Sequence, residues 1–312
     1  MIVNVENLVK RYKDNIALEH FNMNVLEGEI LGLLGPNGSG KTTAINCILG
    51  LLNYDKGIIN VFGEELKSTS YELKRRIGIV PQDIAVFYNL KVWENIDYFC
   101  GLYIDDNSLR KKYVEEAIEF VGLEGHRDKK SQELSGGLRR RLNIACGIAH
   151  KPELIFLDEP TVAVDAQSRN FILDGIKKLS ENGATIVYTT HYLEEAEELC
   201  DRIVIMDNGR DLVTGTLDEL KNMIATTEKI VVEFINPVGD TKKKLESIEY
   251  VREVQNIGEN GKFILKFERG HNNLSVLLDF IKEENLVYET LYSETPSLND
   301  VFLELTGKEL RD

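Results

Sequence analysis

The sequence has no long hydrophobic run. Among its 312 residues no apolar stretch approaches a length of about 18 residues, the minimum for a membrane-spanning helix. The first six residues, Met-Ile-Val-Asn-Val-Glu, also lack the basic and apolar regions of a signal peptide. We therefore expect a protein that stays in the cytoplasm and has no membrane span of its own.

Cysteine and histidine are scarce, and neither is arranged as a set of ligands. The four cysteines are far apart and form no C-x-x-C pair, and the five histidines show no metal-ligand spacing. Each cysteine lies among apolar neighbours, which is typical of buried free thiols in a reducing compartment. The sequence thus predicts no metal site built from cysteine and histidine.

Positive charge is also in short supply. The chain has 37 lysines and arginines against 52 aspartates and glutamates, a net charge of −15. Nucleic-acid binding depends on a basic face that neutralises phosphates, so this balance argues against it. The run Arg139-Arg140-Arg141 leaves two interpretations open, a local basic patch or one solvated helix face. The chain is long enough for one large domain and a smaller one.

One glycine-rich stretch organises the rest of the chain. It reads Gly35-Pro36-Asn37-Gly38-Ser39-Gly40-Lys41-Thr42-Thr43. An apolar run precedes it and a segment with helical spacing follows, the context in which G-x-x-x-x-G-K-[ST] binds a phosphate. The glycines let several backbone N–H groups point at one anion, and the helix N-terminus adds partial positive charge. We expect Lys41 to reach the β- and γ-phosphates of a nucleotide and the Thr42 hydroxyl to bind Mg²⁺.

Two carboxylates follow a fully apolar segment. Residues 154–157 predict a strand buried on both faces, and Asp158 and Glu159 come at its C-terminal end. In open parallel sheets ligands bind beyond the C-terminal strand ends, so both acids should point into the crevice of the phosphate loop. We expect Asp158 to hold Mg²⁺ through water and Glu159 to orient or deprotonate the attacking water.

Three more residues are site candidates with an open alternative. Gln82 follows a predicted strand at 76–80, but a surface glutamine in a turn is an equally good interpretation. His191 ends a predicted strand and shares a sheet edge with the acids, so a catalytic and a structural role both remain open. Tyr12 lies in a predicted loop between strands 2–8 and 18–26, where it could stack on a purine or simply face solvent.

The pattern changes to helical spacing between about residues 84 and 147, which predicts a helical insertion into the sheet domain. Near its end comes Leu134-Ser135-Gly136-Gly137, where Ser135 is a good N-cap and the glycines expose backbone N–H groups. This is a second possible anion site. The insertion begins with an apolar stretch, residues 84–88, in a predicted loop. This stretch could be a surface that binds a partner, or it could cover the insertion's own core.

A second, smaller domain is predicted after the first, with 1–222 and 223–312 as the two parts. The expected strands are 229–235, 250–257, 262–268 and 286–293, and the expected helices are 241–248, 273–284 and 298–305. The first six of these in chain order read β-α-β-β-α-β, a ferredoxin-like α+β unit. The first domain reads as α/β, and we see no candidate for chemistry in the second.

Taken together, the motifs of the first domain resemble those of the ATP-binding cassette (ABC) family over roughly residues 1–220. Tyr12 resembles the aromatic residue that stacks on adenine, and Gly35–Thr42 resembles the Walker A loop. Gln82 resembles the residue of the glutamine loop, and Leu134–Gly137 resembles the signature motif. Leu154–Glu159 resembles Walker B, Asp165 resembles the D-loop residue, and His191 resembles the switch histidine. The signature separates this family from other phosphate-loop NTPases. One departure is Leu138, where the family usually has glutamine.

The resemblance implies a fold and a mechanism. The fold is a RecA-like sheet core with an antiparallel β subdomain and a helical subdomain. Two cassettes close head to tail over two ATP molecules, and each site joins Walker A of one chain to the signature of the other. It further implies Glu159, His191 and Gln82 as catalytic residues, and Thr42, Gln82 and Asp158 as Mg²⁺ ligands.

Residues 134–142, 158–165 and 300–307 are similar to the daunorubicin-type drug-export ATPases, whose permease is a separate polypeptide of the ABC-2 class. This implies an export ATPase on the inner face of the membrane, paired with a second copy or a paralogue. The alternatives are a soluble cassette ATPase acting on ribosomes or DNA, and an ATP sensor without turnover. An ATPase acting on ribosomes or DNA is disfavoured by the single cassette, the lack of a heptad run and the acidic charge balance. An ATP sensor without turnover is disfavoured by the presence of Glu159 and His191.

Overall fold

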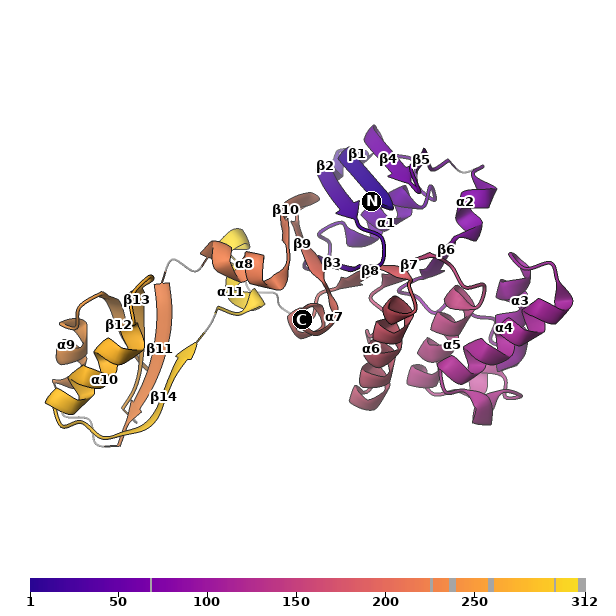
Figure 1. The fold of residues 1–312 in the computed structure, drawn as a ribbon. Helices are drawn as coiled ribbons and strands as arrows, with labels where there is room; N and C mark the ends of the chain where they lie inside the picture. The colour runs from indigo at the N-terminus through magenta and orange to yellow at the C-terminus, as the bar shows by residue number, and fades with distance from the viewer. Residues whose placement is uncertain (68, 225–226, 236–239, 258–260, 295, 308–312) are drawn as a thin grey trace. The chain divides into compact units, whose positions relative to one another are not determined.

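The computed structural model describes residues 1–67, 69–224, 227–235, 240–257, 261–294 and 296–307. The chain folds into two units, one from Met1 to Leu217 and one that begins at Asp218 (Figure 1). Within the described residues, no helix is long and apolar enough to cross a membrane. The four cysteines are free, and Cys200 is the one that is not fully buried.

A six-stranded sheet forms the centre of the first unit. Its order is β10 (Arg210–Gly215), β9 (Arg202–Asp207), β3 (Ile30–Leu34), β8 (Thr185–Thr190), β7 (Leu154–Asp158) and β6 (Ile77–Val80). All neighbours are parallel except β10 and β9. Strands β3, β7 and β8 are buried along their whole length, as their apolar runs predict. Because these three are neighbours and parallel, the segments that follow them emerge at one edge.

A four-stranded antiparallel sheet lies beside this core. Its order is β2 (Asn15–Val25), β1 (Val3–Tyr12), β4 (Lys56–Val61) and β5 (Glu64–Glu65). Its apolar side chains share one hydrophobic cluster with the helix α1 (Lys41–Ile48) and with β3 and β7. The β1–β2 hairpin is longer than predicted, so Tyr12 ends a strand and pairs with Asn15. The end of the hairpin is exposed on both faces, so it carries no alternating pattern.

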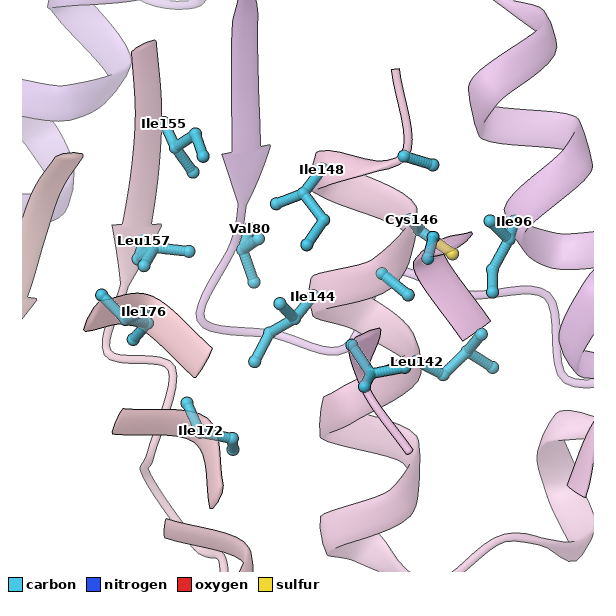
Figure 2. Close-up of a cluster of buried hydrophobic side chains, with 14 of the residues drawn as sticks. Val80, Ile96, Leu142, Ile144, Cys146, Ile148, Ile155, Leu157, Ile172 and Ile176 are labelled. Atoms are coloured by element: carbon cyan, nitrogen blue, oxygen red, sulfur yellow. The ribbon is translucent and has the colours of Figure 1, made fainter. Parts of the chain in front are cut away.

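A group of helices lies on one side of the central sheet: α3 (Val92–Gly101), α4 (Asn107–Phe120), α5 (Gly136–Ile148) and α6 (Ala166–Glu181). Of these, α5 packs against β6, and α3 and α4 pack against α5. Figure 2 shows Ile144 and Ile148 of α5 among the side chains of β6, β7 and α6. Short 3-10 turns at Glu124–His126 and Ser131–Glu133 lead into α5. The two short helices α2 (Tyr71–Arg75) and α7 (Leu193–Leu199) were not predicted, because helices with so few turns show little periodicity.

The second unit has the predicted ferredoxin-like order. Its strands are β11 (Thr227–Phe234), β12 (Val251–Ile257), β13 (Lys262–Glu268) and β14 (Tyr288–Glu294), in the antiparallel order β12-β13-β11-β14. Alternate residues of the strands pack with α9 (Thr241–Glu246) and α10 (Asn273–Glu283) in one hydrophobic cluster. The unit also contains most of α8 (Leu217–Ile224), which was not predicted, and α11 (Leu298–Thr306). An ion pair of 3.2 Å between Lys229 and Asp300 joins α11 to β11.

Candidate nucleotide site

The glycine-rich loop connects β3 to α1, and its backbone path requires glycine at two positions. A Cβ on Gly35 would lie 2.3 Å from the Met206 carbonyl oxygen. Gly40 has a φ of +109°, and a Cβ there would lie 2.8 Å from the Ala17 carbonyl oxygen. No side chain caps the N-terminus of α1, so its first N–H groups are available to an anion. The loop therefore has the backbone that phosphate binding needs.

Lys41 is a buried cation at the start of α1, with 5% of its surface exposed. Its Nζ donates to the Gly35 carbonyl oxygen at 2.8 Å and to the Pro36 carbonyl oxygen at 3.2 Å. It also lies 3.2 Å from Oε1 of Glu159. A buried charge is tolerated only with such partners, and this set holds the ammonium directly under the loop.

Asp158, the last residue of β7, holds two hydroxyl groups. Thr42 Oγ1 donates to its Oδ2 at 2.8 Å, and Thr189 Oγ1 donates to its Oδ1 at 2.6 Å. Thr189 Oγ1 also accepts a hydrogen bond from the Glu159 backbone N–H at 2.9 Å. Sequence analysis missed Thr189. The signal that was present is a pair of threonines at the C-terminal end of a strand that the sequence predicts to be buried.

Glu159 is the point on which the other candidates converge. Its Oε2 accepts a hydrogen bond from Gln82 Nε2 at 3.1 Å and lies 3.4 Å from His191 Nδ1. Its Oε1 faces Lys41. Glu159 is 5% exposed and has a φ of +46°, a left-handed conformation that costs a non-glycine residue about 1–3 kcal/mol. The structure thus brings together side chains from four segments that are far apart in the sequence.

A cleft of about 420 Å³ opens above these residues. Lys41, Thr42, Gln82 and Glu159 lie on its polar side. The other lining residues come from the hairpin, the phosphate loop and a turn after β9: Tyr12, Asn15, Ile16, Ala17, Asn37, Gly38, Gly40, Thr43, Asn208 and Gly209. The Tyr12 ring is half-exposed here, with the Lys10 ammonium 4.9 Å from its centre. The turn 208–209, which sequence analysis did not single out, donates a backbone hydrogen bond to Ser39.

The signature residues lie elsewhere. Ser135 caps α5, and its Oγ accepts the Leu138 N–H at 3.3 Å. Gly137 packs so closely on α6 that a Cβ would meet Ser168 Oγ at 2.3 Å. Asp165 caps α6 by accepting from Ser168, and these hydrogen bonds lower the pKa of Asp165. Among the described residues that line the cleft, none belongs to 134–137, and Asp165 is not one of them.

The arginine run is neither a basic patch nor a solvated face, so both interpretations were wrong. Arg140 is buried and donates to the Pro81 carbonyl oxygen at 3.1 Å, and this burial lowers its pKa. Arg139 donates to the Leu134 carbonyl oxygen at 2.9 Å. Arg141 lies over the Phe171 ring at 3.9 Å. The three side chains leave α5 in different directions, so each meets a different neighbour.

A phosphate loop between a strand and a helix, with an acidic pair at the end of another parallel strand of the same sheet, defines a phosphate-loop nucleotide hydrolase. The comparisons with known proteins agree. Residues 18–162 match the family described as ABC transporter, and residues 215–306 match the C-terminal domain of ATP-binding proteins like DrrA1-3.

Curated relatives match along the whole chain. The linearmycin resistance ATP-binding protein LnrL of Bacillus subtilis is 36% identical over 313 residues, covering 100% of both chains. The Nod factor export ATP-binding protein I of Ralstonia nicotianae is 33% identical and covers 100% of this chain and 95% of the relative.

Solved structures match a large part of the chain. The ATP-binding subunit of an ABC transporter has a TM-score of 0.66 and 27% identity, covering 72% of this chain and 93% of that one. The ATP-binding cassette MJ0796, a dimer bound to ADP and Pi after hydrolysis, has a TM-score of 0.64 and 30% identity, covering 69% of this chain and 99% of that one.

The chain belongs to the ABC transporter family, and it is an ATP-binding subunit with ATPase activity. The resemblance and the α/β cassette fold inferred from the motifs are thereby confirmed. The alternatives of a ribosome- or DNA-acting ATPase and of a sensor without turnover were wrong. ATP-binding subunits of this family dimerise and work with transmembrane permeases.

Proposed function

We propose that this chain hydrolyses ATP with Mg²⁺ to drive export through a separate permease of the ABC-2 class, on the inner face of the membrane. The names of the two curated relatives refer to linearmycin resistance and to Nod factor export, and the second unit matches the DrrA-like C-terminal domain. The exported substrate would be drug-like or lipid-like. The partner cassette would be a second copy of this chain or a paralogue.

The observation that carries the proposal is the convergence of Lys41, Gln82 and His191 on the Glu159 carboxylate. A γ-phosphate seated in the loop competes for the Lys41 ammonium, because it carries more negative charge than one carboxylate. Transfer of Lys41 to the phosphate leaves Glu159 Oε1 free to accept a proton from the attacking water. Gln82 then holds the other carboxylate oxygen through its hydrogen bond, and His191 lies 3.4 Å from that oxygen.

The residues expected to hold Mg²⁺ fit that ion. Thr42 Oγ1 and Asp158 Oδ2 are 2.8 Å apart, so a hydroxyl and a carboxylate offer adjacent hard oxygen ligands. The Gln82 amide would add a third oxygen. Mg²⁺ takes few protein ligands and completes its coordination shell with phosphates and water, so it does not need a larger set of side chains. No group of three or more acidic, histidine or cysteine side chains that could hold a metal ion is found in the described part of the chain. When bound, the ion would neutralise charge that develops on the phosphate oxygens.

The signature would complete the site of a second cassette. Leu134, Ser135, Gly136 and Gly137 lie away from the chain's own cleft, at the N-terminus of α5. Ser135 Oγ accepts a hydrogen bond from Leu138, so its own proton remains to be donated to a γ-phosphate. Head-to-tail closure would place this end of α5, and Asp165 beside it, over the phosphate loop of the partner. Tyr12 would stack on the adenine.

Glu159→Gln tests the proposed role of the carboxylate. The change keeps the side-chain shape and removes the base, so we expect ATP to bind while kcat falls by at least about a hundredfold. The bound ATP should trap the closed dimer, which light scattering detects as a doubling of mass. Glu181→Gln, an exposed change at the end of α6, is the control. Near-normal turnover in Glu159→Gln would show that another group is the base.

The permease would contact an aromatic cluster in which the rings of Phe87, Tyr98 and Phe99 pack together, with Tyr88 next to Phe87 in the chain. Phe87, Tyr88 and Tyr98 are each between 45% and 48% exposed. Phe87 packs against Tyr98 with ring centres 4.9 Å apart and against Phe99 at 5.9 Å. Asn95 exchanges hydrogen bonds with the Phe87 backbone at 2.7 and 3.1 Å, so the loop presents its ring from a fixed position. Exposed apolar surface on an ordered loop favours a partner site.

Phe87→Ala tests this surface. We expect ATP affinity to be unchanged, because Phe87 does not line the cleft, and association with the permease to weaken by about 1–3 kcal/mol. Co-purification with the permease, followed by titration in detergent, measures the loss. Tyr71→Ala, at another highly exposed aromatic, is the control. Undiminished association of Phe87→Ala would assign the cluster to the core of the helical subdomain alone.

A further inference from the structure

Glu195 is a carboxylate with no exposed surface, on the helix α7. Its Oε2 accepts hydrogen bonds from Tyr188 at 2.7 Å and from Thr190 at 2.8 Å. Its Oε1 lies 2.8 Å from Nε of Arg169, near the start of α6. Burial and the nearby charge of Glu195 raise the pKa of Tyr188 well above its usual value, so the phenol keeps the proton that it donates. None of these contacts belongs to the nucleotide cleft.

Glu195 is connected to both neighbours of His191 in the sequence, to Thr190 directly and to Tyr192 through Thr190 and Arg169. Thr190 precedes His191, and Thr190 Oγ1 accepts the backbone N–H of Tyr192, which follows it, at 2.9 Å. The Tyr192 ring lies against the His191 ring with centres 4.2 Å apart, and the Arg169 guanidinium lies 5.2 Å from the Tyr192 ring centre. Glu195 and Arg169 therefore fix the backbone and the stacking partner of His191.

His191 needs such support. Its Nδ1 is buried and has no hydrogen-bond partner among the described residues, at 3.4 Å from Glu159 Oε2. The ring orientation is thus set by its neighbours rather than by a hydrogen bond of its own. Arg169 also follows Asp165 by one helical turn, and the backbone N–H of Arg169 donates to the Asp165 carbonyl oxygen. The same pair therefore connects His191 to the segment that would meet a second cassette.

We propose that Glu195 and Arg169 are positioning residues that hold the His191 imidazole against Glu159 through Thr190 and Tyr192. The inference rests on the catalytic role proposed for His191. Neither residue would touch ATP. Loss of the ion pair lets the segment 190–192 relax, and small misplacements of a catalytic group are costly in rate and not in ground-state binding.

The test compares Glu195→Gln, His191→Ala and the double variant in the full chain. We expect Glu195→Gln to lower kcat for ATP hydrolysis about 10- to 100-fold with the ATP Kd unchanged. Because Glu195 acts through His191, the double variant should have the kcat of His191→Ala alone. Arg169→Met should resemble Glu195→Gln, and Arg169→Lys should recover part of the rate. If Glu195→Gln fails to fold because position 195 is buried, Arg169→Met and Arg169→Lys still test the inference.

A matched control lies between the same two helices. Lys177 of α6 and Glu198 of α7 form an exposed ion pair of 2.8 Å that does not reach His191. Lys177→Met should therefore leave kcat unchanged. The inference is wrong if the losses of kcat multiply in the Glu195→Gln/His191→Ala double variant, or if kcat is normal in both Glu195→Gln and Arg169→Met. Either result leaves the proposed role of His191 intact. Normal kcat in His191→Ala would instead overturn the proposed role of His191, and the inference with it.

Discussion

At the scale of single residues, the site is a set of buried charges that satisfy one another. Lys41 and Glu159 are nearly inaccessible to water and pair at 3.2 Å, while Asp158 is held by two threonine hydroxyls. Removing either member of the pair leaves the other charge buried and unpaired, which costs about 3–5 kcal/mol in folded proteins. Lys41 and Glu159 are thus coupled in stability as well as in the proposed chemistry.

His150 predicts a pH dependence of stability that is separate from activity. It is 7% exposed, its Nε2 lies 3.1 Å from the Ile77 carbonyl oxygen, and its ring stacks on Tyr103 with centres 4.0 Å apart. Burial lowers the pKa of His150 below its ordinary value of 6.5. The unfolded chain therefore binds the proton more readily, and this contribution to stability is lost as pH falls below about 6.5.

His150→Phe keeps the stacking and removes the titration. We expect the melting temperature of the native protein to fall more steeply between pH 7 and pH 5 than that of the variant. Thermal unfolding followed by circular dichroism measures both curves. Carboxylates with lowered pKa values, such as Asp165, contribute equally to the two proteins, so the difference isolates His150. Parallel curves would show that His150 is not the group that titrates.

At the scale of elements, α5 connects two motifs that are distant in the sequence. It begins at the Ser135 cap, and two turns later Asn143 binds the loop that carries Gln82. Asn143 Nδ2 donates to the Pro81 carbonyl oxygen at 3.2 Å, and its Oδ1 accepts the Ala85 N–H at 3.0 Å. Both ends of the segment 81–85 are therefore fixed to the helix that presents the signature.

Asn143→Leu is expected to loosen the Gln82 loop without leaving a cavity, because leucine has the same branching at Cγ and is larger than asparagine. We expect kcat to fall about tenfold with ATP affinity retained, as for a misplaced catalytic group. The cost to the melting temperature should be modest, since Arg140 still satisfies the Pro81 carbonyl oxygen. Steady-state kinetics and nucleotide titration separate the two effects. A raised Kd with normal kcat would mean that the loop serves ATP binding instead.

At the scale of the whole molecule, each unit has hydrophobic clusters of its own within the described residues. The two clusters of the first unit involve residues 2–206, and the cluster of the second involves residues 230–291. All residues that line the nucleotide cleft precede β10. Each unit thus has a core of its own, which is the requirement for independent folding.

We therefore propose that a chain ending at Thr216, before α8, folds and binds ATP. The affinity for ATP should be within about threefold of the full chain, because no cleft residue is removed. A fluorescent ATP analogue measures it, and circular dichroism confirms that the shortened protein is folded. A soluble, folded truncation that fails to bind ATP would show that the second unit contributes to the site.

Local sequence determined a large part of this protein. The phosphate loop, the apolar strands β3, β7 and β8, and the β-α-β-β-α-β order of the second unit all follow from spacing and hydrophobicity within short windows. Backbone conformation and burial respond to nearby residues, so such features can be predicted without knowledge of the partner segments. The family motifs added the remaining candidates, whose catalytic roles stay predictions.

The tertiary structure alone decided how distant residues meet. Thr42 and Asp158 are 116 positions apart in the sequence and share a hydrogen bond of 2.8 Å. The burial of Arg140 and the contacts of Glu195 have no local signal in the sequence. A polar side chain becomes buried and paired only when another element closes over it, and that depends on packing between elements rather than on its neighbours along the chain.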